Sequence, residues 1–212
     1  MLTDKRARLR PKGGYQKLFQ GPALPLASEG ELVFPYTPTV TYNRTSNYGT
    51  YDLPHTNYQP KYWQNTTSPN IQLTAQFTSN TQEEALYTVG ALHFLRMCQL
   101  GHFGASDPMR GSPPPIIEFS AYGRHLFENF PVIVSDVSYT LDSEVDYVEY
   151  NDTTNLDVNI VGYGANSQGA TVVPTSIIVA VSLTHQPNLT QMREEFNVDD
   201  ISTGRLLGRG FV

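Results

Sequence analysis

The chain has 212 residues and a formal net charge of −6, and charged residues make up only 16% of it. This length suffices for one domain with a proper hydrophobic core. The single cysteine, Cys98, excludes an internal disulfide and a zinc site built from cysteines, and we expect it to be a small core residue. The longest aliphatic run, Ile177 to Val181, is too short to span a bilayer, and no signal peptide is recognisable.

Residues 1–30 are expected to form an extended arm. The segment is rich in Gly and Pro and has no sustained periodicity, which is typical of a chain that orders only on contact with a surface. Residues 1–17 hold six Lys or Arg and one acid, Asp4, a balance of +5. A basic arm on an acidic body could bind nucleic acid, dock on an acidic neighbouring protein or stay solvated, and the sequence leaves these alternatives open.

The next segment is β-like up to a predicted helix. Pro35 and Pro38 confine Val33 to Tyr42 to an edge strand or an extended connector, and Asn47 to Gly49 is predicted to be a turn before a long loop. From Ile71 to Thr78 apolar and polar residues alternate, which predicts a strand with one buried face. The sheet is therefore expected to be covered on one side only.

The stretch 81–100 is predicted to be the main helix. Thr81 is a suitable N-cap, and Glu84 three residues later completes a capping box. Gly101 supplies a stop signal. The stripe that we expect to face the core comprises Leu86, Val89, His93, Met97 and Leu100, widened by Ala85, Leu92 and Leu95.

Further strands are predicted after the helix, at 116–122, 130–141, 145–150 and 175–184. The apolar phase shifts between Val134 and Val137, as a β-bulge would allow. Residues 151–170 are polar and Gly-rich, which predicts a long hairpin tip or loop. Residues 188–196 are expected to form a short helix.

These elements predict an α+β fold, a mainly antiparallel β-sandwich or partly open barrel with one packed helix and extended terminal arms. We expect an N-terminal arm at 1–30, a β domain at 31–187 and a C-terminal arm at 188–212. The 21 Thr and 13 Tyr suit a pleated surface. A surface so poor in charge is also typical of one that a partner covers in part.

No catalytic, cofactor-binding or metal-binding residue is predicted. The five histidines are scattered, without a metal-ligand spacing, and no phosphate-binding or nucleophile motif is present. One acidic group could in principle serve a carboxylate hydrolase, but we favour a solvated acidic hairpin. Its members are Asp136, Asp142, Glu144, Asp146 and Glu149. A sugar-binding surface that uses Trp63 and tyrosines is a further alternative.

Several segments taken together resemble the baseplate tail-tube junction and cap proteins, the tail tube initiators, of contractile-tailed bacteriophages. The resemblance runs from about Phe34 to Val212, apart from the region 151–170. The segments that carry it are Phe34-Pro35, HTNYQP at 55–60, QLTAQFTSNTQEEALYTVGALHFLR at 72–96, DPMRGSPPPIIEF at 107–119 and GRLLGRGFV at 204–212.

The resemblance implies a structural virion protein without catalytic residues or cofactors. Six copies would form a ring whose hairpins join into one inner barrel, located in the tail baseplate and assembled in the host cytoplasm. The implied partners are further copies of the chain, the tail tube protein and other baseplate proteins, with phage DNA only passing through the lumen and no membrane. The competing function is a monomeric β-sandwich that binds glycans or hydrolyses them with carboxylates.

Overall fold

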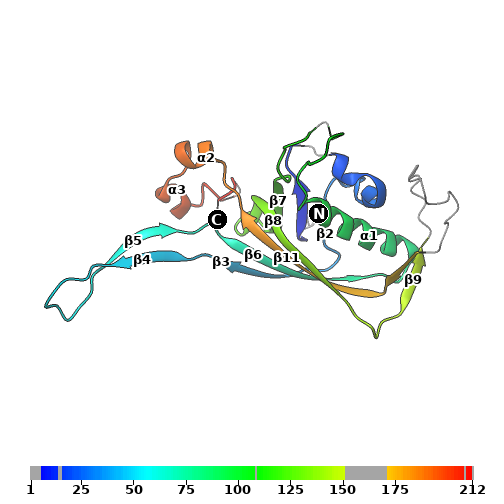
Figure 1. Cartoon of the computed structure of the whole chain (residues 1–212), viewed down its shortest axis with the longest axis horizontal. Coiled ribbons are helices and arrows are strands. Elements are labelled where there is room, and N and C mark those ends of the chain that lie inside the picture. The colour runs from blue at the N-terminus through cyan, green and yellow to red at the C-terminus, as the bar shows by residue number, and fades with distance from the viewer. Residues whose placement is uncertain (1–5, 14–15, 108, 151–170, 208, 212) are drawn as a thin grey trace.

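The computed structural model describes residues 6–13, 16–107, 109–150, 171–207 and 209–211, so the predicted loop at 151–170 lies outside the described residues. The fold is α+β, as predicted, and is built on one open antiparallel sheet of seven strands (Figure 1). The strand order is β2-β1-β7-β8-β11-β6-β3. The strands are β1 (Arg8–Pro11), β2 (Leu32–Val33), β3 (Thr39–Asn43), β6 (Asn70–Thr78), β7 (Ile117–Gly123), β8 (Phe127–Leu141) and β11 (Ser176–His185).

Two smaller sheets extend this core. β4 (Ser46–Thr50) and β5 (Lys61–Thr66) continue β3 and β6 as a hairpin that projects from the body in Figure 1, and β9 (Tyr147–Tyr150) pairs with β10 (Thr171–Pro174). The turn predicted at Asn47 to Gly49 is wrong, because these residues lie within β4. The pairing of β4 with β5 shifts register between Asn47 and Tyr48, which hides the strand pattern in the sequence.

One face of the main sheet carries the hydrophobic core. The alternation predicted for 71–78 is confirmed in β6, and the register aligns its apolar residues with those of β11. The predicted bulge in β8 is also present, since Ser182 pairs with Asp136 and Leu183 pairs with Val134. The buried residues of the two central strands are Ile71, Leu73, Ala75, Phe77, Ile177, Val179, Val181 and Leu183.

The sheet curls around this apolar face. β3 and β7 are four strands apart, which corresponds to about 19 Å in a flat sheet. Yet the Tyr122 hydroxyl on β7 donates to the Pro38 carbonyl oxygen at 3.3 Å, and the Tyr42 and Phe127 rings lie 6.2 Å apart. The curled sheet has open edges at β2 and β3, and a helical layer takes the place of the second sheet of a sandwich.

The helix α1 (Gln82–Met97) begins as predicted. The Glu84 amide donates to Thr81 Oγ1 at 3.3 Å, and the Thr81 amide donates to Glu84 Oε2 at 3.3 Å, which confirms the capping box. The side of the helix that is most buried differs in part from the predicted stripe, of which only Ala85 and Leu95 are fully buried. It comprises Ala85, Thr88, Gly90, Ala91, Phe94 and Leu95, whereas Leu86, Val89, Leu92, His93 and Met97 are half-buried and Leu100 is exposed.

Small residues explain this difference, because α1 is covered on a second side by the N-terminal segment. A Cβ atom at Gly90 would lie 2.9 Å from the Pro22 carbonyl oxygen. Phe94 is fully buried and stacks on Phe19 with ring centroids 5.4 Å apart. The helix therefore lies between the sheet and the turns η1 (Gln16–Phe19) and η2 (Gly21–Leu26).

The expected N-terminal arm is wrong for the described part of residues 1–30. β1 lies between β2 and β7 in the main sheet, and the Leu9 side chain is fully buried. Ala23 and Leu26 of η2 belong to the same core. A four-residue strand and two short 3₁₀ turns are too brief to show a periodicity, and Pro22 and Pro25 both lie within η2.

The segment expected as a C-terminal arm is folded in part. α2 (Leu189–Glu194) confirms the short helix predicted at 188–196, and α3 (Val198–Ser202) follows it. The chain end returns to the body, where Leu206 and Phe211 are buried. His185 Nε2 lies 3.0 Å from the Gly210 carbonyl oxygen and fixes this return.

Candidate functional site

The acidic residues singled out in the sequence do not converge on a cleft. These five residues are all exposed. Asp136 lies on β8 and Glu149 lies on β9, while the turn between the two strands carries Asp142, Glu144 and Asp146. The Glu144 amide donates to Asp142 Oδ1 at 3.2 Å, as in an ordinary turn. Within the described ranges no group of three or more His, Cys, Asp or Glu could hold a metal ion. This arrangement favours the solvated acidic hairpin over a hydrolase site.

Cys98 and the histidines are also poor candidates for chemistry. Cys98 is fully buried, which confirms the predicted core position, and burial raises the pKa of its thiol. His102 Nδ1 lies 2.8 Å from Asp107 Oδ2 in the loop after α1, and Asp107 Oδ1 accepts from the Met109 amide at 2.9 Å. The pair has the geometry of a loop clamp.

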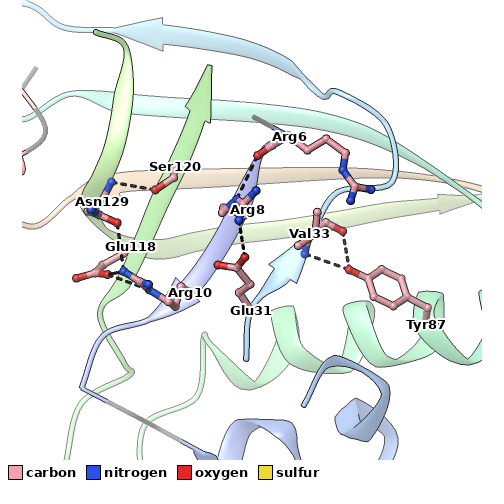
Figure 2. A network of polar contacts seen from close by, with 9 residues as sticks. All are labelled: Arg6, Arg8, Arg10, Glu31, Val33, Tyr87, Glu118, Ser120 and Asn129. Atoms are coloured by element: carbon pink, nitrogen blue, oxygen red, sulfur yellow. Dashed lines mark hydrogen bonds and ion pairs between the residues drawn. The ribbon is translucent and has the colours of Figure 1, made fainter. Parts of the chain in front are cut away.

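The arginines of β1 form internal ion pairs (Figure 2). Arg8 Nη1 lies 2.7 Å from Glu31 Oε1, and Arg10 Nη2 lies 2.7 Å from Glu118 Oε2. Arg10 also donates to Asn129 Oδ1 at 3.2 Å. These contacts border a cavity of about 210 Å³ whose lining includes three arginines, Arg6, Arg8 and Arg10, and two carboxylates, Glu31 and Glu128. The described part of the basic segment is thus anchored on its own chain.

One uncovered feature is the polar face of β3, β6, β11 and residues 136–140 of β8, which we call the open face. Figure 1 shows α1 and the N-terminal turns on one side of the sheet and no helix on the other. Aligned rows cross it, such as Thr41, Gln72, Ser182 and Asp136. Its residues are Thr39, Thr41, Gln72, Thr74, Gln76, Asp136, Ser138, Thr140, Ile178, Ala180 and Ser182. They include one carboxylate, Asp136, and no cation, whereas β1 and β7 carry the ion-paired Arg8, Arg10 and Glu118 on the same side of the main sheet.

The second feature is the projecting hairpin, which we define as β4, β5 and the connecting residues 51–60. Its aromatic side chains are exposed, with Tyr58 at 86% and both Tyr48 and Trp63 at 60%. Tyr48 pairs with Trp63 across the two strands. A two-stranded hairpin alone in water is marginally stable, so these aromatic residues indicate a surface that a partner covers.

The sequence alone did not reveal this hairpin. The sequence pattern predicts a turn at Asn47 to Gly49 and a long loop after it, although Tyr48, Tyr62 and Trp63 have high β-propensity. The pairing of Tyr48 with Trp63 across the two strands identifies the hairpin, and this pairing is visible only in the structure. The open face, in contrast, follows from the alternation in β6 that the sequence did show.

Searches against protein-family models and against curated proteins give no match. Among the described residues, the model has no helix with the length and apolar character needed to cross a membrane. Arguments about function therefore depend on the residues and surfaces described above.

Proposed function

We propose that this chain is a structural subunit of a contractile phage tail. Six copies form a ring at the junction of baseplate and tail tube, nucleate the tube and line the DNA channel. The observation that carries the proposal is the open face, a broad sheet surface with one carboxylate and no cation that continues into the projecting hairpin. The resemblance of segments at 55–60, 72–96, 107–119 and 204–212 to tail tube initiators supports the same function.

The free strand edges supply a way to build a ring. β3 is an outer strand of the main sheet, and both β4 and β5 lack a second neighbour among the described strands. Two different edges on one chain favour head-to-tail contacts, and head-to-tail contacts generate a closed ring when the rotation between copies allows it. Ring closure would also cover edges that otherwise invite aggregation.

The charge of the open face suits a channel for DNA. Protein binds DNA phosphates mainly through Lys and Arg, which release counterions. The open face presents Asp136 and uncharged Thr, Ser and Gln side chains, so it offers phosphates no such contact. We place the acidic turn of Asp142, Glu144 and Asp146 at the same channel, where it repels phosphate.

Partners on either side of the ring are the tail tube protein and other baseplate proteins. The projecting hairpin is the surface that we assign to contacts between subunits, because its exposed aromatic residues would be covered there. The mature location is the virion tail, after assembly in the host cytoplasm. The proteins that contact the ring in the particle determine whether it acts as junction, cap or both.

Shortening the hairpin tests this function. Residues 51–60 are replaced by Asn-Gly, a two-residue loop that can join the paired residues Thr50 and Lys61. We expect the melting temperature to stay within a few degrees of the wild type and the nucleation of tubes from purified tube protein to be lost. Full nucleation by the shortened chain would contradict the role of the hairpin.

A glycan-binding module is the second candidate, and the exposed pair of Tyr48 and Trp63 favours it, since flat aromatic side chains stack on sugars. Trp63 is the only tryptophan, so its fluorescence reports directly on binding. A saturable shift of Trp63 emission with a bacterial surface glycan, absent in Trp63→Ala, would support this candidate. No shift, together with tube nucleation, would exclude it.

A further inference from the structure

The two edges of the main sheet differ in their free hydrogen-bonding groups. β2 has only two residues, and Phe34 directly after it donates its amide to the carbonyl oxygen of Ala7, the residue before β1, at 2.9 Å. Because successive residues of a strand direct their backbone groups to opposite sides, Val33 directs its amide and carbonyl away from β1. Val33 is thus the residue of β2 that could pair with an added strand.

Both outward groups of Val33 are occupied by one side chain. The Val33 amide donates to the Tyr87 hydroxyl oxygen at 3.0 Å, and this hydroxyl donates to the Val33 carbonyl oxygen at 2.6 Å (Figure 2). The phenol of α1 therefore reproduces the two bonds that a neighbouring strand would make. Burial raises the pKa of Tyr87, so the hydroxyl keeps the proton that it donates.

The cavity beside β2 indicates that Tyr87, and not a covering segment, closes this edge. A cavity of about 300 Å³ lies next to Val33 and Tyr87, lined also by Pro35, Tyr36 and Thr78. No described segment of the chain fills this cavity, so the Val33 groups would be accessible without the phenol.

The opposite edge has no proline or charge within the strand itself, although Pro38 and Arg44 flank it. Proteins blunt free edges with short strands, charges, prolines or covering elements. β3 has five residues with the sequence TVTYN and no charge, and it leads toward the equally exposed β4. Among the residues that the structure describes, no strand or backbone group pairs with the outer side of β3.

We propose that Tyr87 determines the direction in which the sheet is extended: it closes the β2 edge, and the β3 edge accepts a strand from a second copy of this chain. The second copy is favoured because the chain also offers a different unpaired edge, at β5, so that one copy can donate what the next accepts. The choice of a second copy rests on the proposed ring, whereas the closure by Tyr87 does not.

Hydrogen exchange of individual amides tests both parts. In the free chain we expect the Val33 amide to be protected and the outward amides of β3 to exchange freely. On assembly with the tube protein, β3 should gain at least tenfold protection while Val33 stays unchanged. Rapid exchange at Val33 in the free wild-type chain would overturn the closure, and unchanged β3 amides in assembled rings would overturn the partner assignment. Failure of ring formation itself would count against the proposed function.

Tyr87→Phe tests the closure by loss of the hydroxyl alone. We expect exchange at Val33 to accelerate at least tenfold and a new concentration-dependent self-association to appear, which Thr39→Lys with Thr41→Lys on β3 does not suppress. Tyr36→Phe is the matched control, since Tyr36 lines the same cavity but its hydroxyl bonds Thr78 Oγ1 at 3.0 Å and not the backbone of β2. A lower melting temperature in Tyr87→Phe without new association would reduce Tyr87 to a stability role and overturn the proposal. If Tyr87→Phe does not fold, exchange in the wild type decides.

Discussion

His185 links the main sheet to the chain end through one side chain. Its ring stacks on Phe130 at 4.4 Å, and Nε2 donates to the Gly210 carbonyl oxygen at 3.0 Å. Burial lowers the pKa of His185 below the ordinary value of 6.5, Arg44 lowers it further, and the bond to Gly210 opposes this shift. The folded chain therefore resists protonation of the imidazole.

This lowered pKa predicts a loss of stability in acid. The folded pKa lies below the unfolded one, so the contribution of neutral His185 is complete above about pH 6.5 and decreases as pH falls toward the folded pKa. We expect His185→Gln to show a shallower decline of the unfolding free energy between about pH 7 and pH 5 than the wild type. Exposed His125→Gln is the control and should keep the wild-type slope. Equal slopes in all three proteins would contradict the assignment.

Cys98 gives a second test at the residue scale. Because the side chain is fully buried and its thiol pKa is raised, we expect a thiol reagent to react with the folded chain at least a hundredfold more slowly than with the unfolded chain. Absorbance of the released thiolate dye measures both rates. Rapid labelling of the folded protein would show that this end of α1 opens, and that the packing described here is wrong.

At the scale of elements, the contact between α1 and η2 makes an unusual prediction for a helix glycine. Gly to Ala inside a helix normally stabilises a protein by about 1 kcal/mol. At Gly90 the added methyl group would meet the Pro22 carbonyl oxygen at 2.9 Å, a backbone atom that cannot rotate away. We expect Gly90→Ala to lower the unfolding free energy by about 1 to 3 kcal/mol in denaturant titrations. A stabilised variant would show that η2 does not cover this side of α1.

The same helix shows what the sequence contained and what it lacked. The capping box of Thr81 and Glu84 is local, and it was predicted correctly together with the alternation of β6. The most buried side of α1 was not predicted correctly, because the predicted stripe is defined by large apolar residues such as Leu86, whereas the small residues Gly90 and Ala91 make the close contact. That contact joins segments about 70 residues apart, and the composition of the N-terminal segment does not specify it.

The candidate surfaces divide in the same way. The open face was predicted in outline, since a strand with one polar side implies an uncovered face. The projecting hairpin and the edge closure by Tyr87 were not, because both depend on pairing between distant segments. The absence of strong chemical motifs in the sequence likewise gave no position for a site.

At the scale of the whole molecule, removing the charges of the acidic turn tests whether this turn lies at the proposed DNA channel. We expect the triple change Asp142→Asn, Glu144→Gln and Asp146→Asn to leave the melting temperature within a few degrees of the wild type, because all three side chains are exposed. Assembled rings of the variant should retain more double-stranded DNA at low salt, since less negative charge opposes the phosphates. Equal DNA retention by wild-type and variant rings would remove the turn from the channel.

Electron microscopy of the purified chain mixed with its tail tube protein tests the central claim most directly. Class averages of the tube ends should show a ring with sixfold symmetry and an open centre, and tubes should form only when the chain is present. The projecting hairpins should lie between neighbouring subunits of that ring. Tubes that grow equally well without the chain, with the chain remaining monomeric beside them, would contradict the account.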